Sequence, residues 1–167
     1  MESDEAREGH REEVYFCPKC GGFTRRGGGD GLCSQCGGPH SEEHHAQKYV
    51  LLVDDSEIAR KKVGAILKKL GCELSEAKDG LEALDRARAE APDLIVLDIQ
   101  MPSMDGLEVL KELRKDDGFA LTPIIMLTVE ADASGVSEAI SHGATDYIRK
   151  DTPVAQIIKR LRTHVEK

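Results

Sequence analysis

Short apolar runs alternate with helical segments across residues 48–167, and this alternation constrains the fold more than any other feature. The runs cover residues 49–53, 94–97, 124–127 and 146–148, and a weaker run covers 73–77. The run 94–97 is entirely apolar, which is typical of a strand that is covered on both faces. Strands that alternate with helices in this way predict a parallel sheet of the α/β class.

The segments between these runs have the periodicity of amphipathic helices. The first has apolar residues at Val63, Ile66, Leu67 and Leu70. This i, i+3, i+4, i+7 spacing predicts one buried face, with Ser56 as the N-cap and Gly71 at the end. The last helix has Thr152 as its predicted N-cap and Pro153 at its first position. Five strand–helix units predict a flavodoxin-like, doubly wound sheet of five parallel strands in the order 2-1-3-4-5.

Acidic residues stop two of the runs. Asp54 and Asp55 follow residues 49–53, and Asp98 follows residues 94–97. Ligands of doubly wound sheets bind outside the carboxyl ends of the strands, so neighbouring strands would bring the three carboxylates together. Like charges so close are unfavourable unless a cation joins them, and oxygen ligands favour Mg²⁺. The sequence therefore predicts a magnesium site at this edge.

A hydroxyl and an ammonium group belong to the same predicted edge. Thr128 ends the run 124–127, and Lys150 follows 146–148. Carboxylates, a hydroxyl and an ammonium around a hard cation are typical of phosphoryl-transfer sites, and a carboxylate can itself be the nucleophile. The competing interpretation, that these residues only cap helices, would have to hold at every position in this order. The chain has no Gly-x4-Gly-Lys, and no Asp-x-Asp after an apolar strand, to support a rival phosphate chemistry.

Together these motifs resemble the receiver domain of bacterial two-component response regulators, over the whole of residues 48–167. The matching positions are Val53, Asp54, Asp55, Ser56, Leu97, Asp98, Met101, Pro102, Asp105, Gly106, Thr128, Tyr147 and Lys150. The resemblance implies that Asp98 accepts a phosphoryl group from a histidine kinase or a phosphotransfer protein. It also implies a downstream protein partner and no enzyme activity beyond slow self-dephosphorylation.

The resemblance assigns roles to the other site residues as well. The implied magnesium ligands are Asp54, Asp55, Asp98 and the backbone carbonyl of Gln100. Thr128 and Lys150 would contact the phosphoryl oxygens, and Tyr147 would be the rotameric switch that follows Thr128.

Two positions depart from the family pattern. The family usually has Lys-Pro with a cis peptide bond where this chain has Lys150 and Asp151. A cis bond without proline costs ~3–4 kcal/mol, so we expect this bond to be either trans or strained. Val129 is β-branched where the family usually has a small residue. It could therefore narrow access to Asp98 and slow phosphotransfer.

Two Cys-x2-Cys motifs, each followed by Gly-Gly, occupy residues 17–38. Their cysteines are Cys17, Cys20, Cys33 and Cys36. This spacing is a strong metal signal, and the glycines let the backbone turn so that its N–H groups point at the sulfurs. Four thiolates suit tetrahedral Zn²⁺, with iron in a rubredoxin-like centre and a reversible dithiol switch as alternatives. The segment resembles a small zinc ribbon with short strands at 23–26 and Leu32, and it is too small to fold without the metal.

These motifs define four parts of the chain. Residues 1–16 are an acidic N-terminal tail, 17–38 the zinc-ribbon-like module, 39–47 a polar linker, and 48–167 the receiver-like domain. Cys72 remains as a lone thiol, which we expect to pack as a small hydrophobic residue.

Charge limits the partners of this chain. It has 23 Lys and Arg residues against 31 Asp and Glu residues, a formal net charge of −8. An acidic chain is poorly suited to a phosphate backbone, so nucleic acid is not the expected partner. No apolar run approaches the ~18 residues of a membrane span. The N-terminus lacks the pattern of a secretory signal, so we expect a cytoplasmic protein whose cysteines do not form disulfides.

These observations favour one function and leave two alternatives. The expected function is a response regulator that lacks a C-terminal effector, accepts a phosphoryl group on Asp98, and signals through protein–protein contacts with the zinc ribbon as a docking module. One alternative is a transcriptional regulator that binds DNA through the ribbon. The other is a pseudo-receiver scaffold that is never phosphorylated.

Overall fold

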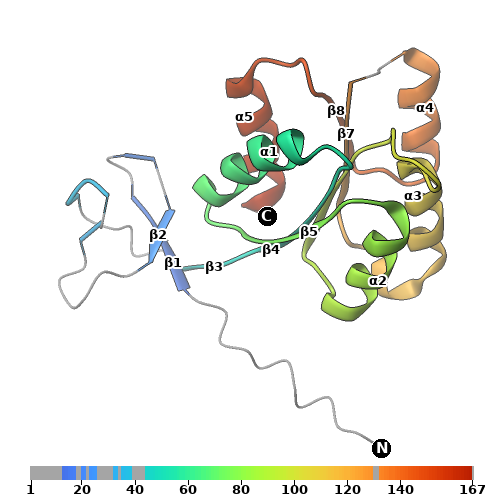
Figure 1. Cartoon of the computed structure of the whole chain (residues 1–167). Helices are drawn as coiled ribbons and strands as arrows, with labels where there is room; N and C mark the ends of the chain where they lie inside the picture. Colours follow the sequence, from blue (N-terminus) through green and yellow to red (C-terminus); the bar gives the residue numbers. More distant parts are fainter. Residues whose placement is uncertain are drawn as a thin grey trace, which may run out of the picture. The chain divides into compact units, whose positions relative to one another are not determined.

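A computed structural model describes residues 13–17, 20, 21, 23–25, 32, 33, 35–38, 44–129 and 132–166. The chain divides into two compact units (Figure 1). One unit spans Lys48–Lys68 and Cys72–Lys167, and we call it the receiver unit. The other spans Met1–Gln47 with Lys69–Gly71, and we call it the cysteine unit because it contains the two Cys-x2-Cys motifs.

Five parallel strands form the sheet of the receiver unit, in the order β5-β4-β6-β7-β8. They are β4 (Tyr49–Val53), β5 (Glu73–Ala77), β6 (Leu94–Leu97), β7 (Ile124–Thr128) and β8 (Asp146–Arg149). Numbered within this unit, the order is 2-1-3-4-5, so the predicted doubly wound parallel sheet is confirmed. Val53 is paired with both Ala77 and Leu97, so β4, β5 and β6 end at the same edge.

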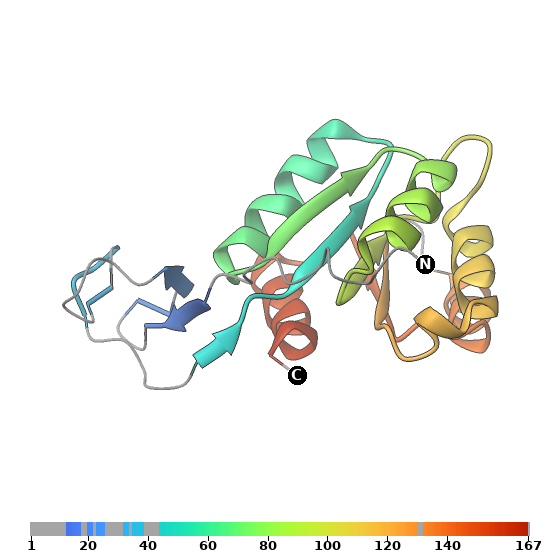
Figure 2. The ribbon, with the colours of Figure 1, turned by 90° about the horizontal axis from the view of Figure 1, so that it is seen from below.

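Helices cover both faces of this sheet. They are α1 (Glu57–Lys69), α2 (Gly80–Glu90), α3 (Gly106–Lys115), α4 (Ala133–Ser141) and α5 (Val154–Val165), with a short 3₁₀ helix η2 (Asp117–Phe119) after α3. Helices α1 and α5 lie on one face, and α2, α3 and α4 lie on the other (Figure 1 and Figure 2). Because both faces are covered, every residue of β6 and β7 is buried, as the apolar run 94–97 predicts.

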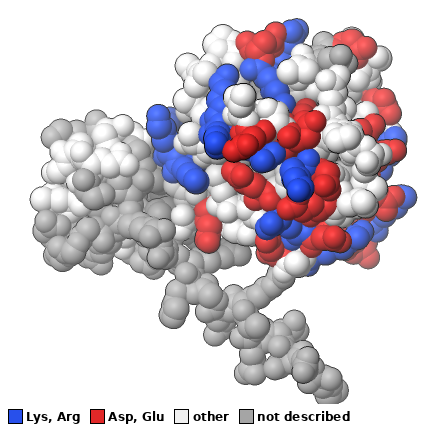
Figure 3. Space-filling view, viewed as in Figure 1, with Lys and Arg blue, Asp and Glu red and all other residues white. Residues whose placement is uncertain are grey.

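Lys, Arg, Asp and Glu side chains are interspersed with uncharged ones on the face of the receiver unit that Figure 3 shows. Its interior is apolar, and Leu51, Ile95 and Ile124 on three neighbouring strands are fully buried. Within the described ranges, none of the helices combines the length and the hydrophobicity needed to cross a membrane.

The caps of the first and last helices show how far local sequence decides where a helix begins. The hydroxyl of Ser56 accepts a hydrogen bond from the N–H of Ala59 at 3.3 Å, as predicted for the start of α1. The predicted cap of α5 is wrong by one residue. Thr152 lies in a turn, where its N–H donates to the carbonyl of Arg149 at 3.1 Å, so the extended Pro153 becomes the N-cap.

The cysteine unit contains an antiparallel sheet in the order β2-β1-β3. Its strands are β1 (Glu13–Phe16), β2 (Phe23–Arg25) and β3 (His44–Ala46). Two of them fall where the sequence suggests a tail and a linker, since β1 lies in residues 1–16 and β3 in 39–47. Strands this short carry too few residues to show a periodicity of their own, so their pairing is not visible in the sequence. The rest of the tail and the glycine-rich residues 27–31 lie outside the described residues.

Candidate functional site

Three acids that follow β4 and β6 meet at the carboxyl edge of the sheet. The N–H of Asp54 donates to the carbonyl of Ala77 at 3.1 Å, and the N–H of Asp98 donates to the carbonyl of Val53 at 2.9 Å. These bonds continue the strand pairing by one residue and fix both acids in place. One carboxylate oxygen from each of Asp54, Asp55 and Asp98 lies within 4.8 Å of the other two. Asp54 and Asp98 are buried and Asp55 is exposed, so Asp55 marks the solvent side of the cluster.

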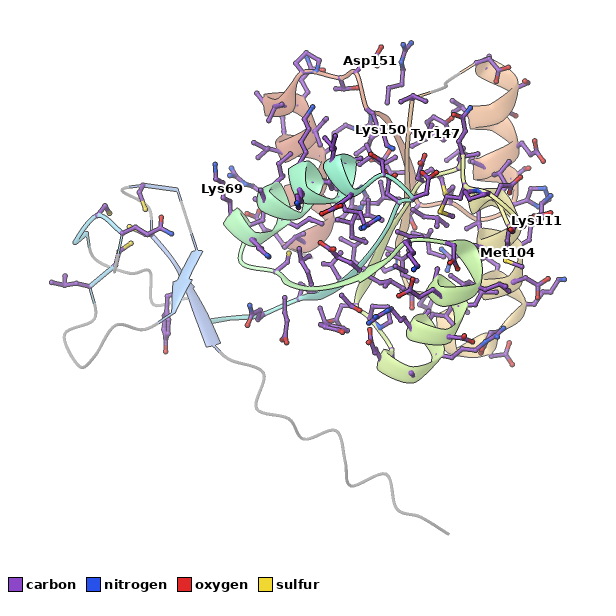
Figure 4. The ribbon with its side chains drawn as sticks, viewed as in Figure 1. Lys69, Met104, Lys111, Tyr147, Lys150 and Asp151 are labelled. Carbon is purple, nitrogen blue, oxygen red and sulfur yellow. The ribbon has the colours of Figure 1, made fainter. Side chains whose placement is uncertain are left out.

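Lys150 supplies positive charge at this edge (Figure 4). Its Nζ lies 2.5 Å from Oδ2 of Asp54 and 3.2 Å from Oδ2 of Asp98. The N–H of Lys150 donates to the carbonyl of Thr128 at 2.7 Å, which ties the loop after β8 to the end of β7. The peptide bond between Lys150 and Asp151 is trans. The lysine therefore reaches both acids without the cis bond of the family pattern.

The cluster keeps a net negative charge. Burial and repulsion from Asp54 raise the pKa of Asp98, and Lys150 offsets only part of this effect. Burial would lower the pKa of Lys150, but its contacts with Asp54 and Asp98 outweigh burial and raise it. The ammonium group therefore stays protonated, and one positive charge faces three carboxylates. A further cation is favourable at such a site.

Two buried oxygens at this edge have no hydrogen-bond partner in the part of the chain that the structure describes. They are Oδ1 of Asp98 and the hydroxyl oxygen of Thr128. Buried polar atoms are almost always paired, and an unpaired one costs about 1–3 kcal/mol. Carboxylate oxygens beside a free hydroxyl and a lysine are the groups that Mg²⁺ and a phosphoryl group require. The residues present therefore fit both.

Gly106 has a packing role at the site that the sequence analysis missed. A Cβ atom on Gly106 would lie 2.0 Å from the carbonyl oxygen of Asp98, closer than any real contact. The N–H of Gly106 donates to the carbonyl of Ile99 at 2.8 Å, so the start of α3 packs directly on the loop that carries Asp98. A signal was present, because Asp105 and Gly106 form an N-cap and a glycine shortly after a strand-stopping acid.

Three further predicted residues lie around the cluster. Tyr147 is buried on β8, three residues before Lys150 (Figure 4). Gln100 is exposed in the loop after β6, and Val129 is 54% exposed directly after Thr128. Their roles as switch, metal ligand and obstacle to phosphotransfer stay predictions.

The four cysteines of the two motifs form a second cluster. The Sγ atoms of Cys17 and Cys36 are 3.5 Å apart, and those of Cys20 and Cys33 are 3.8 Å apart. These distances exceed a disulfide bond of ~2.05 Å. They match the ~3.8 Å edge of a sulfur tetrahedron around zinc, for Zn–S bonds of ~2.3 Å. Cys72 stands apart, since burial raises the pKa of its thiol to about 12 and leaves it unreactive.

The two Cys-x2-Cys turns share one backbone hydrogen bond and one glycine conformation. The N–H of Gly21 donates to the carbonyl of Cys17 at 2.8 Å, and the N–H of Gly37 donates to the carbonyl of Cys33 at 2.9 Å. Both glycines have positive φ, 69° and 66°, a conformation that side chains disfavour. The N–H of Gln35 points at Sγ of Cys33 at 3.4 Å, as expected for a thiolate that binds metal. The described parts of the two turns therefore follow the same hydrogen-bond pattern.

The fold and the edge together define a class of protein. A doubly wound sheet that joins three carboxylates, a buried threonine hydroxyl and a lysine at its carboxyl edge is the arrangement of a receiver domain. The family model described as response regulator receiver domain matches residues 50–162. This chain belongs to the response regulator receiver domain family.

Individual relatives agree with this assignment. The polar-differentiation response regulator DivK of Brucella anthropi is 38% identical over 119 residues, which cover 71% of this chain and 96% of DivK. The solved structure of the chemotaxis response regulator CheY4 of Vibrio cholerae has a TM-score of 0.66 and 36% identity, over 71% of this chain and 98% of that chain. The BeF3-activated receiver domain of RstA from Klebsiella pneumoniae has a TM-score of 0.66 and 30% identity, over 71% and 99%.

Proposed function

We propose that this chain is a two-component response regulator whose Asp98 accepts a phosphoryl group from a phosphohistidine of a histidine kinase or phosphotransfer protein. In that step an oxygen of Asp98 forms a bond to phosphorus while the P–N bond breaks and the imidazole nitrogen keeps the electron pair. The observation that carries the proposal is the buried, unpaired Oδ1 of Asp98, beside Asp54 and Lys150 in the described structure. Such an oxygen is costly unless a ligand uses it.

The neighbouring residues have complementary parts in this proposal. Mg²⁺ would be held by Asp54, Asp55, Asp98 and the backbone carbonyl of Gln100. When bound, it neutralises negative charge on the phosphoryl oxygens. Lys150 Nζ lies 3.2 Å from Oδ2 of Asp98, so it can donate to an oxygen of a phosphoryl group held there. The buried hydroxyl of Thr128 can supply a second donor.

Phosphorylation would be passed on as a change of conformation. A phosphoryl group adds about −1.5 to −2 charges to an edge that is already acidic. Thr128 would turn toward the new oxygens, and Tyr147 would follow it as the switch. A downstream protein would read the surface of α4, β8 and α5. This function needs no enzyme activity beyond slow self-dephosphorylation.

The cysteine unit is proposed to hold Zn²⁺ through its four clustered cysteines and to dock to a partner protein. Four thiolates with Zn²⁺ add two negative charges to residues 1–47, which already have 5 basic and 9 acidic residues. This balance weighs against DNA as the partner. Metal analysis with a visible spectrum tests the ion, because iron bound by four thiolates is coloured and zinc is not.

Acetyl phosphate with Mg²⁺, applied to the full chain, tests the receiver proposal. We expect the intact mass to rise by one phosphoryl group in the wild type and not in Asp98→Asn. Asp85→Asn changes an exposed acid on α2 and is the matched control, expected to react like the wild type. If neither acetyl phosphate nor beryllofluoride alters the wild-type chain, it is a pseudo-receiver scaffold. Phosphotransfer profiling against candidate histidine kinases then identifies the donor.

A further inference from the structure

Backbone hydrogen bonds hold the turn that carries Lys150. Arg149, the last residue of β8, is paired with Thr128 of β7. The N–H of Lys150 donates to the carbonyl of Thr128 at 2.7 Å, and the N–H of Thr152 donates to the carbonyl of Arg149 at 3.1 Å. The second bond closes a four-residue turn whose two central residues are Lys150 and Asp151.

A side-chain ion pair spans the same turn. Nε of Arg149 donates to Oδ1 of Asp151 at 2.8 Å, and Nη2 of Arg149 donates to Oδ2 of Asp151 at 2.5 Å. Two such parallel bonds fix the relative orientation of the two groups as well as their distance. The side chain of Asp151 is 61% exposed and that of Lys150 is 18% exposed. Asp151 therefore lies on the solvent side of the turn and Lys150 on its buried side (Figure 4).

We propose that Arg149 and Asp151 are positioning residues, which hold the turn so that Lys150 reaches Asp54 and Asp98 together. The proposal rests on the proposed phosphoryl transfer to Asp98, in which Lys150 donates to a phosphoryl oxygen. Nζ of Lys150 lies 2.5 Å and 3.2 Å from the two acids, so a small shift of its backbone breaks one of the two contacts. A misplacement of ~1 Å in a reacting group can cost up to ~100-fold in rate.

The ion pair supplies a restriction that the backbone of this turn lacks. A proline at position 151 would fix its own φ and would also limit the conformations of Lys150 before it. Asp151 imposes neither limit through its backbone. Its side chain instead joins it to Arg149, whose backbone is already fixed on β7. Exposed ion pairs usually contribute little to stability, and the bidentate geometry seen here is the exception in which such a pair fixes a conformation.

The rate of phosphorylation of the full chain by acetyl phosphate with Mg²⁺ is the first test. We expect Asp151→Ala and Arg149→Ala each to lower the rate constant about threefold, since the lysine is flexible and the backbone bonds of the turn remain. The double variant Arg149→Asp with Asp151→Arg rebuilds the ion pair in reverse and should recover most of the rate. Glu166→Ala removes an acid from the exposed Arg162–Glu166 pair of α5 and is the matched control, expected to react like the wild type.

A double-mutant cycle on stability tests the same positioning without phosphorylation. Lys150→Met should lower the Tm of the wild type, and it should lower the Tm by about half as much when Asp151→Ala is already present. The reason is that a lysine without its positioning pair no longer holds both acids. If the wild type is not phosphorylated at all, the proposed function fails, and this cycle still decides whether Asp151 positions Lys150.

Three results would overturn the proposal. Faster phosphorylation of Asp151→Ala would mean that this acid only repels the anionic phosphoryl donor. No recovery in the reversed pair would mean that the two side chains do not act together, and an additive cycle would mean that the pair has no influence on Lys150. Thermal unfolding checks each variant. If Arg149→Ala is unfolded, Arg149→Lys takes its place, and it must lower the rate about twofold because lysine keeps the charge but cannot form two parallel bonds.

Discussion

The receiver unit and the cysteine unit each bring together side chains that could hold a metal ion, but the two units differ in how much apolar core surrounds those side chains. The receiver unit buries apolar side chains on both faces of its sheet, and its carboxylates lie at the edge of that core. In the described part of the cysteine unit, the buried hydrophobic residues are Tyr15, Cys17, Cys33 and Leu70, and two of these four belong to the sulfur cluster. A metal ion is therefore expected to serve chemistry in the first unit and stability in the second.

Metal removal should have the largest effect, and it should unfold the cysteine unit while the receiver unit stays folded. We expect a chelator, or Cys33→Ser, to unfold the cysteine unit, because structural zinc contributes ~10–16 kcal/mol to small modules. Hydrogen exchange should then show loss of protection in residues 13–38 and none in residues 49–165. Cys72→Ser is the matched control and should leave the cysteine unit protected. If residues 13–38 stay protected without metal, the strand pairing of β1 alone is sufficient and the contrast between the units is wrong.

Gly106→Ala should cause the largest loss within the receiver unit. The new Cβ would meet the carbonyl oxygen of Asp98 at 2.0 Å, so α3 or the loop must move. We expect the free energy of unfolding to fall by about 3 kcal/mol in denaturant titrations. Gly118→Ala is the control, since its Cβ meets only a carboxylate oxygen of Asp116, at 3.2 Å. An equal loss in both variants would show that α3 does not depend on this close approach.

Lys150→Met tests how much the positive charge of Lys150 contributes to the stability of the receiver unit. The change leaves three carboxylates facing one another, and we expect a loss of about 2 kcal/mol, less than for a fully buried pair because the lysine side chain is 18% exposed. Mg²⁺ should restore most of that stability and should stabilise the variant more than the wild type. Lys111→Met is the control, and an equal response to Mg²⁺ in all three proteins would contradict the expectation.

The receiver fold could be predicted almost completely from the sequence, because its signals are local and repeated. The apolar run 94–97 became β6, and Ser56 caps α1 as expected. In the cysteine unit, by contrast, strands β1 and β3 were not predicted. Each has only three or four residues, too few to show a periodicity, and β1 pairs with strands that lie elsewhere in the sequence. The cap of α5 failed because a turn made by Thr152 and Arg149 competes with the helix start.

The sequence predicts which residues meet at the candidate site, but it does not predict the contacts between them. Strand order alone brings Asp54, Asp55 and Asp98 to one edge, since parallel strands end together. The 2.5 Å contact between Lys150 and Asp54 depends on the path of a loop and on side-chain rotamers, which no spacing reveals. The close approach of Gly106 depends on the packing of α3 against that loop. The order of the residues in the sequence thus predicts which side chains meet, whereas the packing of loops and helices sets the distances between them.

Asp98→Asn should produce the smallest change in stability, and it should be a gain. Folding raises the pKa of Asp98, so the folded state holds its proton more tightly than the unfolded state does. The stability from this group is present below the unfolded pKa, near ~3.9, and is lost as pH rises through the folded pKa. Asn cannot ionise, so without Mg²⁺ the variant should have a Tm a few degrees above the wild type at neutral pH, with the gap closing in acid.

Thermal unfolding across this pH range decides the sign, and Asp85→Asn, which changes an exposed acid on α2, is the control. A lower Tm for Asp98→Asn at neutral pH would mean that the attraction of Lys150 outweighs burial and repulsion from Asp54. The ionised carboxylate would then stabilise the receiver unit. In that case the site of the receiver unit would also contribute to stability, as we expect of the four clustered cysteines. The two units would then no longer differ as a site for chemistry and a site for stability.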